Sequence, residues 1–148
     1  MVSLLDVNVL VALAWPNHVH HRAAHAWFAG QSHEGWATCS LVELGFIRVS
    51  SNARVTPAAV SPQEAASLLR RMTGMPNHHF WADDVRFAES PHVGLDRVAG
   101  HQRVTDAHLV GLAIRRRHRI ATFDPGLRSL VPAGQDAEAV VCVIPAGV

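Results

Sequence analysis

Residues 2–10 read VSLLDVNVL, and this stretch sets the fold that we expect of the whole chain. Val2 to Leu5 is an apolar run too short for a helix, and polar residues follow it at once, which is typical of a fully buried first strand. The residues that follow predict a helix over 9–14, with Asn8 as its N-terminal cap. A buried strand leading straight into a helix is the repeating unit of a parallel α/β sheet.

The same alternation continues along the 148 residues. Further strands are predicted at residues 36–39, 78–82, 120–123 and 139–144, and helices at residues 19–30, 40–51, 62–74, 85–88 and 106–117. No internal repeat or low-complexity tract interrupts the pattern. We therefore predict a single domain, residues 1–148, with an α/β fold: a three-layer α/β/α arrangement around a central, mostly parallel sheet of four or five strands.

Local signals set the expected helix starts. Ser40 to Glu43 and Ser61 to Glu64 both have the spacing of a capping box, in which the serine accepts from a helix amide and the glutamate reaches back. Pro62 suits the first helical position, and Thr105 is a good cap for a helix that begins at Asp106.

Four acidic residues stand where an apolar run stops and a helix begins: Asp6, Glu43, Asp106 and Asp124. Strands of a parallel sheet end at the same edge, so residues at those ends meet in space although they are far apart in sequence. Unit charges about 4 Å apart repel by roughly 4 kcal/mol at an effective dielectric of 20. A bound cation would remove this repulsion.

The strings around these acids are LLDVNVL at Leu4, SLVELGFIR at Ser40, VTDAHLVGLA at Val104 and ATFDPGL at Ala121, in that order. Together they resemble the PIN-domain nucleases, and within these the VapC-type toxins of bacterial toxin–antitoxin systems. The likeness extends from Leu4 to Leu127, and all four acidic positions are filled.

This resemblance implies a magnesium-dependent ribonuclease, with manganese as an alternative metal, in which Asp6, Glu43, Asp106 and Asp124 hold one or two ions. Oxygen ligands from a rigid scaffold suit magnesium. We expect Asp6 and Asp106 to bind the ion directly, and Glu43 and Asp124 to bind it directly or through water. The resemblance also implies an RNA substrate, a VapB-type antitoxin partner and a homodimer.

Two of the acids, Glu43 and Asp106, also have a purely structural interpretation. Glu43 would serve as the reciprocal partner in its capping box, and Asp106 would favour a helix N-terminus through the helix dipole. Asn8 and Thr122 lie two residues from Asp6 and Asp124, so we take them as candidates that orient a ligand carboxylate or a water.

All 13 basic residues are arginine, whose planar fork pairs well with phosphate. Arg48, Arg103 and Arg128 are candidate phosphate contacts, whereas Arg115 to Arg119 close a helix and suit its C-terminal dipole. The histidines at 18, 20, 21 and 25 have no neighbouring acidic or cysteine ligand and no HExxH pattern, so we do not predict a zinc site.

Cys39 and Cys142 lie in apolar stretches outside any CxxC pair, which favours buried thiols in a reducing cytoplasm. The N-terminal run lacks a basic leader and is broken by Asp6 and Asn8, so we expect neither a signal peptide nor a membrane span.

Other protein classes fit less well. A phosphoacceptor receiver domain would need a lysine, and the chain has none. A dinucleotide-binding domain would need a glycine-rich loop after the first strand, where this chain has DVN. The alternative that remains is a non-catalytic PIN-like module that binds RNA or another protein.

Overall fold

The computed structural model describes residues 1–146, which form a five-stranded sheet with strand order β3-β2-β1-β4-β5. The strands are β1 (Ser3–Leu5), β2 (Trp36–Cys39), β3 (His78–Trp81), β4 (Arg119–Thr122) and β5 (Val141–Val143). Every neighbouring pair runs parallel. The prediction of a mostly parallel sheet of four or five strands is confirmed.

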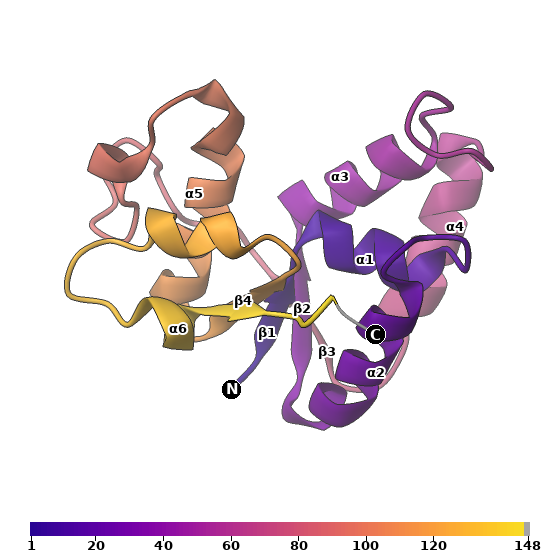
Figure 1. Ribbon diagram of the computed structural model, residues 1–148, viewed down its shortest axis with the longest axis horizontal. Helices are drawn as coiled ribbons and strands as arrows, with labels where there is room; N and C mark the ends of the chain where they lie inside the picture. Colours follow the sequence, from indigo (N-terminus) through magenta and orange to yellow (C-terminus); the bar gives the residue numbers. More distant parts are fainter. Residues whose placement is uncertain (147–148) are drawn as a thin grey trace.

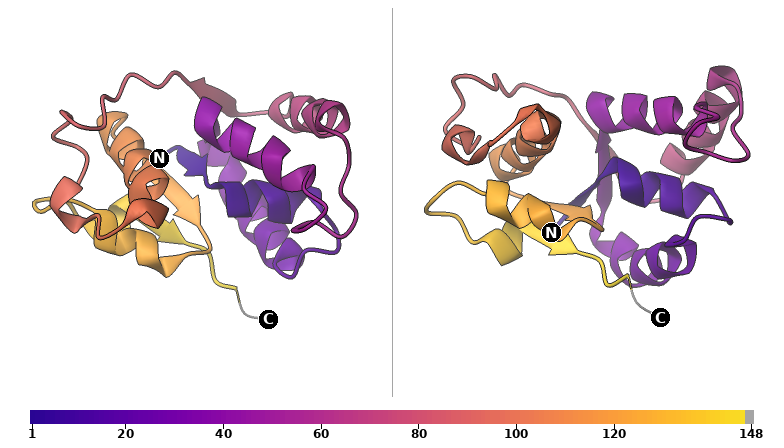
Figure 2. Two further views of the ribbon diagram at one scale, coloured as in Figure 1. Left: turned by 90° about the horizontal axis from the view of Figure 1, so that it is seen from above. Right: turned by 45° about the horizontal axis from the view of Figure 1, so that its top comes forward.

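Helices cover both sides of this sheet. They are α1 (Val7–Ala14), α2 (His21–Gln31), α3 (Ser40–Ser50), α4 (Pro62–Thr73), α5 (Val104–Arg115) and α6 (Ala137–Val140), counted over the described residues. Figures 1 and 2 show α1 to α4 gathered on one side of the strands and α5 and α6 on the other. The three-layer α/β/α arrangement is therefore confirmed.

The core lies where the central strand β1 meets the two helical layers. Leu4 and Leu5 of β1, Leu10 of α1, Phe46 of α3 and Leu112 of α5 are all fully buried. Burial of an aliphatic or aromatic side chain contributes about 1.5–3 kcal/mol. This packing holds β1 and α1 rigidly, and the first candidate acid, Asp6, stands between them.

Only one of the two predicted capping boxes supplies its serine cap. The Ser61 hydroxyl accepts from the Glu64 amide at 3.1 Å, and Pro62 opens α4 as expected. The prediction for Ser40 was wrong: α3 begins at Ser40 itself, Cys39 is the N-cap, and no side chain caps the helix. Because Ser40 lies inside the first turn, its hydroxyl is not placed to accept from the helix amides.

The caps predicted for two other helices were also wrong. Asp6, not Asn8, caps α1, because β1 leads into the helix without a spacer and the Asp6 carboxylate reaches the Val7 amide. Thr105 lies within α5, because the 3-10 turn His101–Arg103 precedes the helix and Arg103 occupies the N-cap position.

Several element predictions differ from the structure. The helix expected at 19–30 spans His21–Gln31. Residues 85–88 form irregular chain and a turn instead of a helix. The final strand begins at Val141 and not Ala139, because Asp136 accepts from the amides of Glu138 and Ala139 and so starts the short helix α6.

The strand order brings the carboxyl ends of β1 and β4 together. The Asp6 amide donates to the Ala121 carbonyl at 3.0 Å, so the chain segments that carry Asp6 and Asp124 leave the sheet side by side. Among residues 1–146, no helix is long and apolar enough to cross a membrane.

Candidate active site

Asp6 is a buried carboxylate fixed from two directions. Its Oδ1 accepts from the Val7 amide at 2.8 Å, and its Oδ2 accepts from the Thr122 hydroxyl at 2.8 Å. Only 7% of the residue is exposed. A buried carboxylate needs such donors to offset the loss of water.

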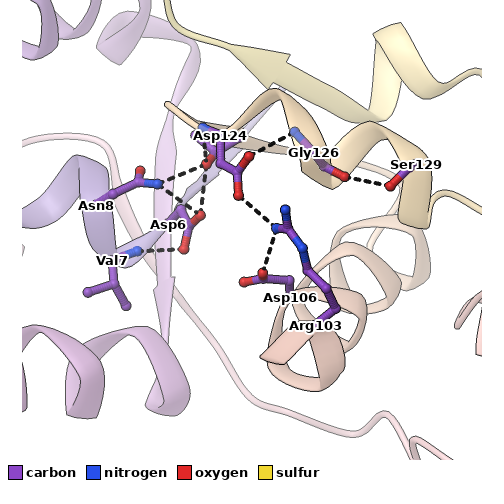
Figure 3. Close-up of polar contacts among 9 residues, drawn as sticks. Asp6, Val7, Asn8, Arg103, Asp106, Asp124, Gly126 and Ser129 are labelled. Carbon is purple, nitrogen blue, oxygen red and sulfur yellow. Dashed lines mark hydrogen bonds and ion pairs between the residues drawn. The ribbon is translucent and has the colours of Figure 1, made fainter. Parts of the chain in front are cut away.

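Thr122 and Asn8 connect Asp6 to the end of β4, and Figure 3 shows Asn8 beside Asp6 and Asp124. Asn8 donates through Nδ2 to the Thr122 hydroxyl oxygen at 3.1 Å and, more weakly, to Asp6 at 3.4 Å, while its Oδ1 accepts from the Phe123 amide at 3.2 Å. The Asp124 amide also donates to the Thr122 oxygen, at 3.1 Å. The two residues proposed to orient Asp6 are therefore in contact with it.

Asp124 and Asp106 share one arginine. Nη1 of Arg103 lies 2.7 Å from Oδ2 of Asp124 and 3.1 Å from Oδ2 of Asp106, as Figure 3 shows. The other carboxylate oxygen of Asp124 accepts from the Gly126 amide at 2.8 Å. Asp106 comes from the first turn of α5, whereas Asp124 lies two residues after the end of β4.

Asp6, Asp106 and Asp124 line one pocket of about 350 Å³. Asn8 and His18 also line it, together with apolar walls from Val7, Val11 and Val49. Three of the four acids predicted from the sequence thus meet at one end of the sheet, although they are separated by up to 118 residues.

Glu43 does not line this pocket. Its Oε2 accepts from the hydroxyl of Thr38 at 2.6 Å, and the same hydroxyl lies 2.8 Å from Nε2 of His78. Thr38 is fully buried near the end of β2. Thr38 of β2 therefore holds Glu43 in the same way that Thr122 of β4 holds Asp6. Glu43 does not reach back to cap α3 as we had predicted.

The electrostatics of the pocket are those of a site short of positive charge. The pKa of Asp6 is raised from its ordinary value of 3.8 to about 6, chiefly by burial and also by the nearby Asp106 and Asp124 carboxylates, against the lowering effect of the Thr122 and Val7 hydrogen bonds. The Arg103 hydrogen bond lowers the pKa of Asp124. The arginine thus neutralises the outer part of the pocket, while Asp6 has no cationic partner among residues 1–146.

The donor set fits a hard divalent ion. All three acids offer oxygen atoms, which magnesium and manganese prefer over nitrogen or sulfur. In the present side-chain positions, no three histidine, cysteine, aspartate or glutamate side chains of residues 1–146 are grouped closely enough to hold a metal ion. Two of the candidate ligands are bound to Arg103, so they would have to turn toward Asp6 to share an ion.

Comparison with known proteins agrees with this geometry. The family model described as PIN domain matches residues 3–131, which is most of the chain and includes every acid described above. The chain is 47% identical over 134 residues to Ribonuclease VapC39 of Mycobacterium tuberculosis, covering 90% of this chain and 96% of the relative. This chain belongs to the PIN-domain family, in its VapC ribonuclease branch.

Other relatives of this PIN domain give the same assignment. It is 44% identical over 129 residues to Ribonuclease VapC38 of Mycobacterium tuberculosis, with 87% of this chain and 89% of the relative covered. Its fold matches the crystal structure of VapBC2 from Rickettsia felis bound to a promoter DNA fragment, with a TM-score of 0.61 and 13% identity. The match covers 89% of this chain and 97% of the other chain.

Sequence reasoning missed the place of His18 in the PIN-domain pocket. The turn after α1 brings this ring to the pocket wall, and its Nδ1 accepts from the His20 amide at 3.0 Å, so the neutral ring carries its proton on Nε2. Burial, and then His20 and His21, lower the pKa of His18. The sequence signal was only a histidine-rich turn, which does not show which ring faces the acids.

His21, His25 and two of the three candidate arginines lie away from the acids of the pocket. His21 and His25 bond to the carbonyls of Ala12 and Leu13 at the end of α1. Of the three arginines predicted to contact phosphate, Arg103 binds the acids, Arg128 donates to the Val141 carbonyl at 3.3 Å, and Arg48 is exposed on α3.

Proposed function

We propose that this PIN-domain protein is the toxin of a type II toxin–antitoxin system and that it hydrolyses RNA phosphodiester bonds with a magnesium or manganese ion. Its membership in the VapC ribonuclease branch supports nuclease activity. The observation that carries the proposal is that Asp6, Asp106 and Asp124, which come from three separate parts of the chain, line one pocket.

The chain's own groups have distinct roles in this proposal. Asp6 and Asp106 are the direct ligands, Asp124 completes the site, and Thr122 and Asn8 fix the Asp6 carboxylate in place. When bound, the ion would polarise the phosphoryl group and favour a hydroxide-like water. The position of the attacking water relative to the phosphorus is essential, because an attacking group that is held in line with its target reacts far faster than a free one.

His18 and Glu43 have supporting roles. A neutral imidazole with its proton on Nε2 offers the pocket a donor without competing with a metal ion for the acids. We propose that Glu43 acts through water, since its carboxylate is held by Thr38 outside the pocket wall. Second-layer groups of this kind commonly contribute 10- to 100-fold, as an order of magnitude, to metal affinity or activity.

The proposed partners follow from the relatives. The Rickettsia felis structure contains VapBC2, and we propose that a VapB-type antitoxin likewise binds the present protein. We also propose a homodimer. An RNA substrate would place the protein in the cytoplasm.

The alternative is a PIN-like module that binds RNA or protein without cutting. Three acids in one pocket oppose it, because without a cation they would repel the phosphates that such a module has to bind.

Cleavage of a single-stranded RNA by the wild type and by Asp106→Asn tests the proposal, each in magnesium and in chelator. Asp106 suits this test because, within the described part of the chain, its side chain is hydrogen-bonded only to Arg103, so its replacement should leave the fold intact. Cleavage confined to wild type in magnesium supports the proposal. RNA binding in all four samples without any cleavage would favour the binding module instead.

A further inference from the structure

Arg103 holds the two outer acids of the pocket with a single nitrogen atom. Its Nη1 contacts Oδ2 of Asp124 at 2.7 Å and Oδ2 of Asp106 at 3.1 Å, and these are oxygens of two of the proposed metal ligands. The guanidinium therefore lies where a cation is required electrostatically. A second cation cannot take both oxygens until the arginine leaves.

The chain leaves space for this arginine at Gly126. A side chain at this position would overlap Nη2 of Arg103 and would come within 2.9 Å of Oδ1 of Asp124. The absence of a Cβ thus lets the guanidinium approach Asp124 from the side of the 3-10 segment Pro125–Leu130 (Figure 3).

The contact is built to be reversible. The side chains of Arg103 and Asp124 are each 38% exposed, and that of Asp106 is 26% exposed, so water can replace every bond that breaks. Exposed ion pairs contribute little individually, about 0.2–1 kcal/mol. Arginine stays protonated at any physiological pH, so only a competing cation or anion can change its partners.

We propose that Arg103 is a resident cation that exchanges places with the divalent ion. The ion takes the Asp106 and Asp124 carboxylates, and the released guanidinium, still anchored just before α5, binds a phosphate of the RNA. This inference rests on the proposed function. It assigns to Arg103 two successive partners, carboxylate and then phosphate, so that metal binding prepares the site for substrate.

The competing explanation is that Arg103 is a permanent structural bridge between the two acids, and it predicts the opposite change in metal affinity. If Arg103 only positions the two acids, then its removal should scatter them and weaken metal binding. If it competes with the metal, its removal should strengthen metal binding.

Calorimetric titration with Mn²⁺ separates these two explanations. The proteins compared are wild type, Arg103→Ala and Arg97→Ala, and each variant loses one positive charge. Arg97, six residues before Arg103, is the matched control, because it is exposed and has no ion pair among the described residues. We expect Arg103→Ala to bind Mn²⁺ about tenfold more tightly, equivalent to about 1.4 kcal/mol, and Arg97→Ala to match wild type. Equal or weaker binding by Arg103→Ala overturns the exchange. No Mn²⁺ binding by wild type would instead refute the proposed function, and this inference with it.

The second step, in which the released Arg103 binds an RNA phosphate, is tested by measuring the affinity for a phosphorothioate RNA that resists cleavage. In chelator, wild type and Arg103→Ala should bind this RNA equally, because Arg103 is held by the acids. With Mn²⁺ the wild type should bind roughly fivefold more tightly than Arg103→Ala, as expected for one exposed charge contact. A difference of the same size in both conditions would refute the metal-dependent release.

Discussion

The hydroxyl of Thr122 donates a 2.8 Å hydrogen bond to the carboxylate of Asp6, 116 residues earlier in the chain. The same oxygen accepts from the Asn8 side chain and from the Asp124 amide. One fully buried hydroxyl therefore links the ends of β1 and β4 and fixes the innermost acid of the pocket.

Replacement of Thr122 by valine should destabilise the protein by about 1–3 kcal/mol, because the buried Asp6 carboxylate loses a donor and the Asp124 amide loses its acceptor. Activity should also fall, since Asp6 would no longer be held. Urea unfolding and RNA cleavage measure the two effects. Thr122→Ser is the matched control, since it keeps the hydroxyl, and it should lose much less stability and much less cleavage activity than the valine variant. Equal losses in the two variants would mean that packing of the threonine methyl, and not the hydrogen bond, is what matters.

The raised pKa of Asp6 predicts a specific dependence of stability on pH. The native state holds the Asp6 proton up to about pH 6, whereas the unfolded chain releases it near 3.8. This contribution to stability is therefore complete below pH 3.8 and is lost as the pH rises through 6, by about 3 kcal/mol in all.

The measurement compares the unfolding free energies of wild type and Asp6→Asn in chelator between pH 4 and pH 7. The difference isolates Asp6 from the other acids, among them Asp124, whose lowered pKa acts in the opposite direction. Wild type should lose stability relative to the variant as the pH rises. Added magnesium at pH 7 should stabilise wild type more than Asp6→Asn, since ligand that binds only the native state stabilises it. A difference that stays flat with pH would contradict the prediction.

The sequence was sufficient to predict that the strand-end acids meet. Asp6 and Asp124 each follow a buried apolar run directly, and parallel strands share an edge, so their convergence needed no knowledge of side-chain contacts. The two-residue spacing from Asp124 also pointed to Thr122, but β4 ends at Thr122, and its hydroxyl holds the carboxylate of Asp6 and only the amide of Asp124.

The side-chain partners could not be predicted in this way. Glu43 had a plausible local partner in its capping box, but the tertiary contact with Thr38 replaced it. Arg103 stands three residues before Asp106, a spacing that allows an ion pair on a helix, yet its shorter contact is with Asp124, 21 residues later. Both cases depend on a neighbouring element, about which local sequence carries no information.

The different positions of Glu43 and Asp106 predict a graded loss of activity. Asp106 lines the pocket, so Asp106→Asn should lower the cleavage rate by more than about 100-fold, beyond the range of second-layer groups. Glu43→Gln should lower it by about 10- to 100-fold, because Glu43 acts from outside the pocket wall. Single-turnover cleavage of one RNA in magnesium compares them. Identical losses would place Glu43 among the direct ligands and would require its side chain to leave Thr38.

Gly126→Ala offers an independent way to displace Arg103 without removing it. The added Cβ would overlap the guanidinium, and a flexible arginine can move aside, while the alanine amide still donates to Asp124. We therefore expect Gly126→Ala to change stability little and to tighten Mn²⁺ binding, as Arg103→Ala does. Since both changes act on the same contact, their effects should not add: in the Arg103→Ala background, Gly126→Ala should leave the Mn²⁺ affinity unchanged. Additive effects would show that Gly126 acts on Asp124 directly, through the 2.9 Å approach to its Oδ1, and not through the arginine.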